Sequence, residues 1–307
     1  MSAALQEIPD SLRRALEADV AHALGAAVVL APFALPKGVA DETLKLAARS
    51  ARGELLGVVL CSPEIAPRLI ARGCERGREA RGVLGAELGR AVVIARAEGA
   101  CEGRSWAIFP PARVLGSGVA AGLERRWLAG ALFAWLRAVA ARTAGAADDA
   151  ARAATDAALG YAGREPALDA RVRDAARSAR ALLAGGTWRP RHVLMHGDLW
   201  RGNLLGAPGA PPFSRRFVLI DWDTSRAAGY PLFDLVRAAR SFGVAHGRLA
   251  REIAAHGALL GLDSAQSRAA LVAALGHIGL VRESFPLERY AAMCRENLAT
   301  FDAAVAS

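Results

Sequence analysis

Lysine is nearly missing from this sequence. Only two of its 39 basic residues, Lys37 and Lys45, are lysines, which leaves 37 arginines. We attribute this preference to a coding bias in a chain that is rich in arginine, alanine and glycine. The scarcity leaves few candidate positions for any function that depends on a lysine side chain.

Long apolar runs are missing as well. The longest uncharged apolar stretch near the N-terminus, residues 23–35, stops at Pro36. A membrane-spanning helix needs about 20 such residues. The N-terminal segment also carries acidic residues early and lacks the basic-then-apolar order of a secretory signal. We therefore expect no membrane span.

Cysteines and aromatic residues are few. The four cysteines, Cys61, Cys74, Cys101 and Cys294, lie too far apart in the sequence for a metal knuckle or a redox pair. Scattered thiols indicate a reducing compartment, so we expect a cytoplasmic protein. Aromatic residues make up only 6% and the arginines are spread along the chain. The formal net charge of +9 is therefore interpreted as a solvated surface and not as a nucleic-acid site.

What the sequence does contain is enough apolar material for a large core. Its 307 residues, 53% of them hydrophobic, suit two lobes. The apolar patterns before residue 110 predict five strands, with one long helix inserted after the third. The expected helices are residues 10–24 and 65–88, and the expected strands are residues 26–34, 43–47, 55–61, 91–95 and 106–109.

A break at Pro110 and Pro111 marks the predicted lobe boundary. We expect an N-lobe over residues 1–110 and a C-lobe over residues 111–307, as a monomer or a homodimer. The C-lobe pattern is mainly helical, and Asp263 is a candidate helix cap. The expected helices are residues 123–142, 147–161, 168–184, 232–242, 249–260, 265–282 and 287–305.

Polar residues follow two short apolar runs of the C-lobe, residues 193–195 and 217–220. The sequence HGDLWRGN (196–203) follows the first run, and LIDWD (219–223) ends the second. We expect the two runs to pair as a rigid hairpin. Two carboxylates and a carboxamide are hard oxygen ligands that suit Mg²⁺, which binds through one or two carboxylates plus substrate phosphates. The remaining carboxylate could then accept a proton from an attacking hydroxyl, as in phosphoryl transfer.

These motifs, with GYPLFDL (229–235) after them, resemble those of the aminoglycoside phosphotransferase and choline kinase-like superfamily of small-molecule kinases. The HGDLW sequence is also similar to that of fructosamine kinases in the same superfamily. The close match covers residues 192–236. The resemblance implies an α+β, bilobal, protein-kinase-like fold, with an antiparallel sheet and one inserted helix in the N-lobe and a mostly helical C-lobe.

The resemblance also implies roles for individual residues. Asp198 would be the catalytic base, and Asn203 and Asp221 would hold Mg²⁺ on the phosphates of ATP or GTP. Asp223 would be a second metal contact or support the first. The remaining residues in the motifs divide into two groups: His196 and Asp234 would brace the loop, and Trp200, Arg201, Arg226, Tyr230 and Arg237 are candidates for the acceptor site.

One residue that such kinases usually carry is missing. A lysine of the third strand normally holds the α- and β-phosphates and pairs with a glutamate of the inserted helix. Here Leu60 stands at the lysine position, while Glu79, or Glu75 one turn earlier, fits the helix partner. Lys45 on the second strand either replaces the lysine or is a solvated strand residue, and Lys37 is a further candidate.

Three functional hypotheses follow. The first is an active kinase that phosphorylates a hydroxyl of a sugar, a glycan precursor or a natural product. The second is a degenerate kinase fold that binds a ligand or partner without catalysis, which Leu60 would explain. The third is an aminoglycoside resistance kinase. The third needs a site rich in acids for a polycation, whereas the C-terminal acids Glu288 and Glu296 are interleaved with arginines.

Overall fold

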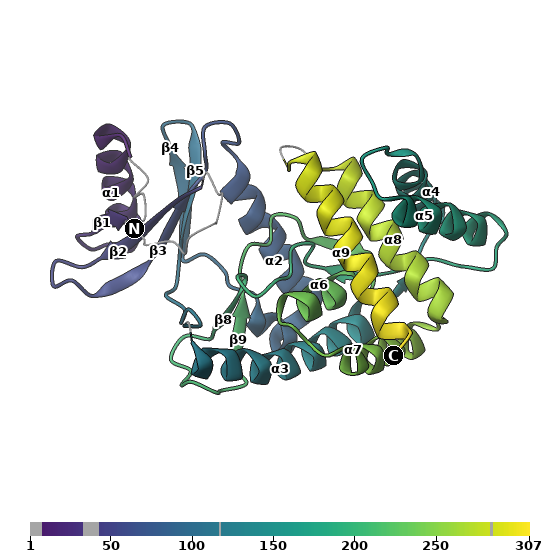
Figure 1. Cartoon of the computed structure of the whole chain (residues 1–307). Coiled ribbons are helices and arrows are strands. Elements are labelled where there is room, and N and C mark those ends of the chain that lie inside the picture. The colour runs from purple at the N-terminus through teal and green to yellow at the C-terminus, as the bar shows by residue number, and fades with distance from the viewer. Residues whose placement is uncertain (1–7, 33–42, 117, 283–284) are drawn as a thin grey trace.

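The computed structural model describes residues 8–32, 43–116, 118–282 and 285–307. Its N-terminal part holds a five-stranded antiparallel sheet in the order β1-β2-β3-β5-β4, and the rest of the chain is mainly helical (Figure 1). The predicted α+β, protein-kinase-like fold class is therefore confirmed. The strands of the sheet are β1 (Val29–Pro32), β2 (Leu44–Arg49), β3 (Leu55–Cys61), β4 (Ala97–Cys101) and β5 (Arg104–Phe109).

Two helices cover opposite faces of this sheet. Helix α1 (Asp10–Leu24) packs its buried face, which includes Leu16, against sheet residues such as Val59. Helix α2 (Leu69–Leu88), inserted after the third strand as predicted, lies on the other face. The alternation of side chains along β3 explains this arrangement, because successive residues of a strand point to opposite faces.

The predicted strand at residues 91–95 is wrong. The fourth strand is β4, and residues 89–91 form a short 3₁₀ turn. Val92 is buried against the helical part of the chain and bridges Leu219, so its apolar character reflects contacts outside the sheet. The sequence of β4, AEGAC, shows no clear alternation of apolar and polar residues. The strand lies at the edge of the sheet and most of its residues are exposed, so few of them need to be apolar. Residues 33–34 of the expected first strand, and Lys37, lie outside the described residues.

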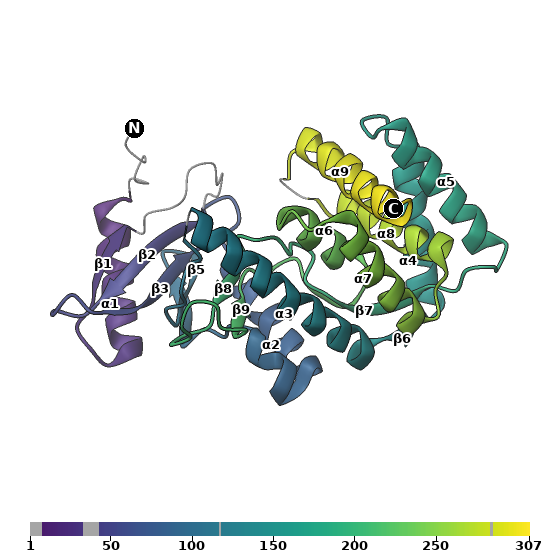
Figure 2. The same ribbon diagram turned by 60° about the horizontal axis from the view of Figure 1, so that its bottom comes forward.

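The C-terminal part packs its helices around one large core that includes Trp188, Phe133, Phe233, Tyr290 and Phe301. Helix α3 runs from the side of the sheet into the helical part of the chain and ends near β6 (Figure 2). Asp263 caps α8 by accepting a hydrogen bond from the Gln266 backbone at 2.8 Å. The helices are α3 (Val119–Thr143), α4 (Asp149–Arg164), α5 (Ala170–Ala184), α6 (Phe233–Ser241), α7 (His246–Leu260), α8 (Ser264–Leu280) and α9 (Leu287–Val305).

The two short apolar runs do not pair with each other as predicted. They belong to different small sheets: β7 (Arg191–Met195) lies between β10 (Arg226–Gly229) and β6 (Gly145–Ala146), whereas β9 (Phe217–Leu219) pairs with β8 (Leu204–Gly206). An apolar run does not encode its pairing partner. The two motif segments still meet, because the Ile220 amide donates to the Asn203 carbonyl at 3.1 Å.

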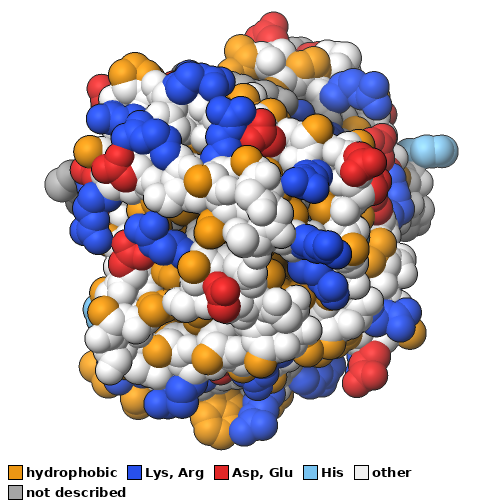
Figure 3. Space-filling model, turned by 90° about the vertical axis from the view of Figure 1, so that its right-hand side faces the viewer, with side chains coloured by type: hydrophobic (Ala, Val, Ile, Leu, Met, Phe, Trp, Pro, Cys, Tyr) orange, Lys and Arg blue, Asp and Glu red, His pale blue; other side chains and the backbone are white. Residues whose placement is uncertain are grey.

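Charge on the helical end of the molecule is mixed, with arginines next to acids (Figure 3). Ion pairs there include Arg180 with Asp156 and Arg268 with Asp302, both at 2.7 Å. This distribution fits a solvated arginine-rich surface. Within the described part of the chain, no helix is both long and apolar enough to cross a membrane.

Candidate active site

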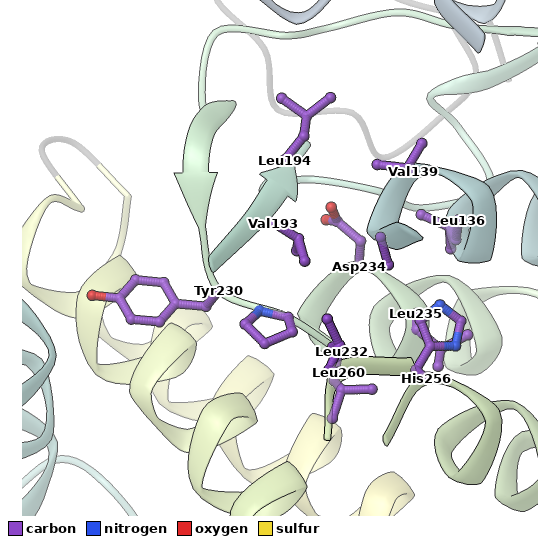
Figure 4. A pocket seen from close by; sticks show the side chains of 12 residues that line it. Leu136, Val139, Val193, Leu194, Tyr230, Leu232, Asp234, Leu235, His256 and Leu260 are labelled. Carbon is purple, nitrogen blue, oxygen red and sulfur yellow. The ribbon is translucent and has the colours of Figure 1, made fainter. Parts of the chain in front are cut away.

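The loop after β7 is fixed to the start of α6 by one buried carboxylate. Asp234 accepts hydrogen bonds from the backbone amides of His196, at 2.6 Å, and Gly197, at 3.0 Å. Its side chain lies among apolar residues such as Val193 and Leu232 (Figure 4). Burial raises the pKa of Asp234, while the two amide donors act in the opposite direction. The cavity beside it has a volume of about 20 Å³, which leaves room for about one water molecule and none for an organic substrate.

His196 is buried and both ring nitrogens have partners. Its Nδ1 accepts from the Asp198 amide at 3.3 Å, and its Nε2 donates to the Ile220 carbonyl at 3.0 Å. This pairing describes a neutral imidazole that links the two motif segments. The ring also lies on Trp222, with centroids 4.5 Å apart. Since Nδ1 is occupied by a backbone donor, the histidine has the contacts of a structural support.

Gly197 is required by the backbone of this loop. Its φ is +85°, a conformation that favours glycine, and a Cβ there would lie 2.7 Å from the Thr224 carbonyl oxygen. The close approach lets the Thr224 hydroxyl donate to the His196 carbonyl at 3.0 Å. The loop that carries Asp198 is therefore tied to Thr224, which precedes β10, and to Asp234 of α6.

The Asp198 carboxylate is held at both oxygens. The Asn203 side-chain amide donates to Oδ2 at 3.0 Å and to the Asp198 carbonyl at 2.9 Å. Arg237 of α6 forms an ion pair with Oδ1. The Asn203 Oδ1 atom has no hydrogen-bond partner among the residues that the structure describes. An oriented carboxylate and an available amide oxygen thus lie side by side.

Asp221 follows β9 in a strained conformation. Its φ is +69°, which places a non-glycine residue in the left-handed region, and the residue is exposed. Such strain persists where surrounding structure imposes it and is concentrated at functional sites. The neighbouring Ile220 amide bonds to the Asn203 backbone, so Asp221 and Asn203 are adjacent across the two loops.

Asp223 lies deeper and faces helix α2. Arg72 Nη2 is 3.7 Å from its Oδ2, and Arg76 donates to its backbone carbonyl. Burial raises the pKa of Asp223; the Arg72 charge opposes this and the Asp198 charge adds to it. The interaction with Asp198 indicates that the acids of the two motifs share one electrostatic environment.

The donors fit Mg²⁺ better than a softer metal. Asn203 and Asp221 offer an amide and a carboxylate oxygen, with Asp223 close behind, and these are hard ligands. Among the described residues, no three His, Cys, Asp or Glu side chains form a cluster with metal-ligand spacing. A site with only a few protein ligands suits Mg²⁺, since this ion keeps waters and takes phosphate oxygens as further ligands.

On the sheet, the lysine position of other kinases is part of an apolar contact. Leu60 packs against the cluster of Ile70, Cys74 and Ala107, the first two from α2. Strand pairing aligns Lys45 directly opposite Leu60, and Leu60 opposite Ala107. Directly opposed residues share one face of a sheet. Lys45 therefore projects from the same face as Leu60, one strand away.

Glu79, the predicted helix partner of the lysine, is exposed on α2, five residues after Cys74, which faces Leu60. Five residues turn a helix by about 140° from any starting side chain. Glu79 therefore lies on a different face of α2 from Cys74. Glu75 is exposed too and lies 3.8 Å from Arg68, while the ion pair from α2 to the sheet joins Arg78 to Glu98.

The acceptor candidates divide into two groups. Trp200 lies against Gly202 of its own loop, and Arg201 is exposed with its backbone amide bound to Ser241. Arg226 is exposed and lies 3.0 Å from His277 Nε2, and the Tyr230 ring is 5.3 Å from that of His277. Burial, with the Arg226 charge, lowers the pKa of His277 to about 4, so His277 is neutral at pH 7.

Three contributors were missed from sequence: Arg72 and Arg76 on Asp223, and His277 beside Arg226. The arginines had a detectable signal, the repeated Arg-Gly pairs at 72–73 and 76–77. Glycine inside a helix indicates a close approach of another segment. The partner of Asp198, Arg237, was expected near the acceptor and not on the base.

A braced loop with an oriented aspartate, an asparagine five residues later and an acid after the next strand define a kinase-like phosphotransferase site on a kinase-like fold. The family model of the phosphotransferase enzyme family matches residues 15–271. The chain belongs to this family, and it is a small-molecule phosphotransferase.

Solved structures share the fold at low sequence identity. A thermostable mutant of the aminoglycoside phosphotransferase APH(4)-Ia, in a ternary complex with ADP and hygromycin B, superposes with a TM-score of 0.59 at 16% identity, covering 93% of this chain and 98% of that one. A protein assigned as a fructosamine-3-kinase from Haemophilus somnus 129PT gives 0.58 at 9% identity, covering 95% and 98%. A search of the curated proteins finds no match.

Proposed function

We propose that the protein transfers the γ-phosphate of ATP, or of GTP, to a hydroxyl of a small molecule. The observation that carries this proposal is the Asp198 carboxylate, which Asn203 and Arg237 hold at its two oxygens. A side chain kept only for surface solubility would not need such fixation. The loop beneath it is clamped by Asp234, so the carboxylate is preorganised.

Asp198 acts as the general base. The acceptor oxygen attacks the γ-phosphorus, its proton passes to Asp198, and the bond to the leaving nucleoside diphosphate breaks. Arg237 and Asn203 keep the carboxylate in one orientation during this step. Positioning of this kind supplies much of the rate enhancement in phosphoryl transfer, because the protein does little covalent chemistry.

Asn203 and Asp221 would hold Mg²⁺, with Asp223 as a second contact or a support. The ion, when bound, neutralises charge that develops on the transferring phosphoryl group. The exposed, strained Asp221 and the available Asn203 amide oxygen support this assignment. Lys45 would contact the nucleotide phosphates from β2. We place the nucleotide between an N-lobe of residues 1–110 and a C-lobe of residues 111–307.

The acceptor is proposed to be neutral or anionic, such as a sugar, a glycan precursor or a natural product. Two exposed side chains near the Asp198 loop, Arg201 and Arg226, are cationic, and Arg226 lies 3.0 Å from Nε2 of the neutral His277. A polycationic aminoglycoside would be repelled by these charges. This weighs against a resistance kinase of that type.

Leu60 favours one alternative, a kinase fold that binds a ligand without transferring phosphate. The lysine position is apolar, and Leu60 packs against α2. The intact set of Asp198, Asn203 and Asp221 argues for the active form, since a protein that no longer catalysed would not be constrained to keep these three residues.

The proposal is tested with a panel of hydroxyl compounds and a coupled readout of nucleoside diphosphate release. The panel should pair neutral and anionic members, such as glucose with glucuronate and glycerol with glycerate, and include aminoglycosides. Mg²⁺-dependent turnover that disappears in Asp198→Ala supports the active kinase. Nucleotide binding without turnover on any member supports the non-catalytic alternative.

A further inference from the structure

Helix α2 packs against the loop at residues 221–223. A Cβ at Gly73 would lie 3.6 Å from the Cβ of Asp223, and a Cβ at Gly77 would lie 3.8 Å from that of Trp222. Both distances are ordinary van der Waals contacts, so these two positions of the helix face the loop directly.

This contact brings two arginines of α2 onto Asp223. Arg76 donates to the backbone carbonyl of Asp223 and so pins the helix to the loop. Arg72 differs, because its Nη2 lies 3.7 Å from the Asp223 carboxylate, which is beyond hydrogen-bond distance. The Arg72 side chain is 36% exposed. A guanidinium has five N–H donors in a planar fork, so it can contact more than one partner at once.

The surroundings of Arg72 are those of the proposed phosphate site. Asp223 is two residues from Asp221, and the Asp198 charge acts on it. The sheet offers no cation at the usual lysine position of the third strand, since Leu60 stands there and packs against α2. Positive charge toward bound phosphates must therefore come from elsewhere, and α2 brings Arg72 to 3.7 Å from the Asp223 carboxylate.

We propose that Arg72 is a phosphate-binding residue, which supplies from helix α2 the positive charge that a third-strand lysine supplies in other kinases. This inference rests on the proposed function. The planar guanidinium would contact Asp223 with one edge and a phosphate oxygen of the nucleotide with another. Lys45 approaches from the sheet, so the two cations would act from different sides of the nucleotide.

The test measures equilibrium binding by titration calorimetry of Mg²⁺-ATP, Mg²⁺-tripolyphosphate and adenosine. The variants are Arg72→Ala, Arg72→Lys and the matched control Arg68→Ala, whose exposed arginine pairs with Glu75 on the same helix. Arg72→Ala should weaken Mg²⁺-ATP and Mg²⁺-tripolyphosphate about 10- to 100-fold, the loss of one charge-assisted contact. The affinity for adenosine should change by no more than about twofold, which is well below the loss expected from one charge-assisted contact. Arg72→Lys should recover part of the loss, and Arg68→Ala should bind as wild type.

Each other outcome has a definite meaning. Unchanged Mg²⁺-ATP binding in Arg72→Ala overturns the assignment and leaves the proposed function standing. Equal losses for adenosine and Mg²⁺-ATP show a structural effect and also overturn it. If the wild type binds neither Mg²⁺-ATP nor Mg²⁺-GTP, the proposed function fails and the Arg72 role fails with it. If Arg72→Ala folds poorly, Arg72→Lys becomes the measured variant. In that variant, the same ratio of Mg²⁺-ATP affinity to adenosine affinity as in the wild type supports the role of a positive charge.

Discussion

The two halves of the candidate site are built in different ways. In the C-terminal half, the loop carrying Asp198 is fixed by Asp234, His196 and Thr224, and the carboxylate itself is held by Asn203 and Arg237. In the N-terminal half, the expected lysine is Leu60 and the expected glutamate faces solvent.

The difference teaches which requirements are strict. An acceptor proton needs a carboxylate at one defined place, so the residues around Asp198 are tightly specified. A phosphate needs positive charge, which can arrive from several directions. Lys45 lies opposite Leu60 on β2, and Arg72 of α2 lies near Asp223. A chain that favours arginine can therefore meet this requirement without a third-strand lysine.

The largest effect is expected for the acids of the C-terminal half. Asp198→Ala and Asp221→Ala should each lower turnover by about 10²- to 10⁴-fold, the usual contribution of a general base or a comparable catalytic group. Both variants should keep the wild-type melting temperature within a few degrees, since neither side chain belongs to the core. Coupled kinetics on the best acceptor of the panel measure this. Wild-type turnover in Asp198→Ala would refute the base assignment.

Removal of the brace should affect stability. Asp234→Ala would leave two buried backbone amides without an acceptor and should lower the free energy of unfolding by about 2–4 kcal/mol. Asp156→Ala is the matched control: it breaks an exposed pair with Arg180 and should cost less than about 1 kcal/mol. Urea unfolding compares them. Similar losses in the two variants would show that the loop is not held through Asp234.

Restoring the usual lysine should harm the N-terminal half. Leu60→Lys would place an ammonium in the contact with Ile70 and Cys74, directly opposite Lys45. We expect a loss of about 1–3 kcal/mol in unfolding free energy and no gain in nucleotide affinity. Leu60→Met is the control that keeps the volume. Tighter Mg²⁺-ATP binding at unchanged stability would contradict the view that the charge has been relocated.

Lys45 should matter moderately. Lys45→Ala is expected to raise the KM for nucleotide about tenfold, equivalent to about 1.4 kcal/mol, and by more than Leu60→Ala does. Lys45→Arg should retain most of the affinity. Steady-state kinetics with varied nucleotide measure all three variants. Equal effects of Lys45→Ala and Leu60→Ala would return Lys45 to a solvated strand residue.

The smallest effect is a pH dependence in the C-terminal half. The pKa of His277 is about 4 in the folded protein, against about 6.5 when unfolded. The unfolded state therefore binds the proton first, and stability falls as pH drops from about 6.5 to about 4. After allowance for solvent screening we expect a loss of about 1–2 kcal/mol. His277→Gln should flatten this part of the pH profile, and an unchanged profile would exclude His277 as its source.

Much of the fold was accessible from sequence. Helix 10–24, strand 55–61 and helix 287–305 were predicted with the observed bounds, and the inserted helix was placed after the third strand. The strand at 91–95 and the hairpin were wrong, because burial of Val92 and the partners of β7 and β9 depend on tertiary contacts. Propensity and periodicity carry no such information.

The residues of the candidate site also divide into those that local sequence predicts and those that depend on tertiary contacts. Its acids could be found because they lie in contiguous motifs with fixed spacing. The roles of Arg72, Arg237 and His277 could not, since each depends on helices that meet the loops only in the folded chain. The exposure of Glu79 could not be predicted either, because the sequence does not show which face of the helix packs on the sheet, here the face of Cys74.

The most direct test of the central claim is the change in unfolding free energy on adding Mg²⁺-ATP or Mg²⁺-GTP to wild type and to Asp221→Ala. Ligand at about 100 times its dissociation constant should stabilise the wild type by about 2.7 kcal/mol. The same concentration should stabilise Asp221→Ala much less, because the proposed metal contact is gone. No stabilisation of the wild type by either nucleotide would contradict a nucleotide-dependent kinase.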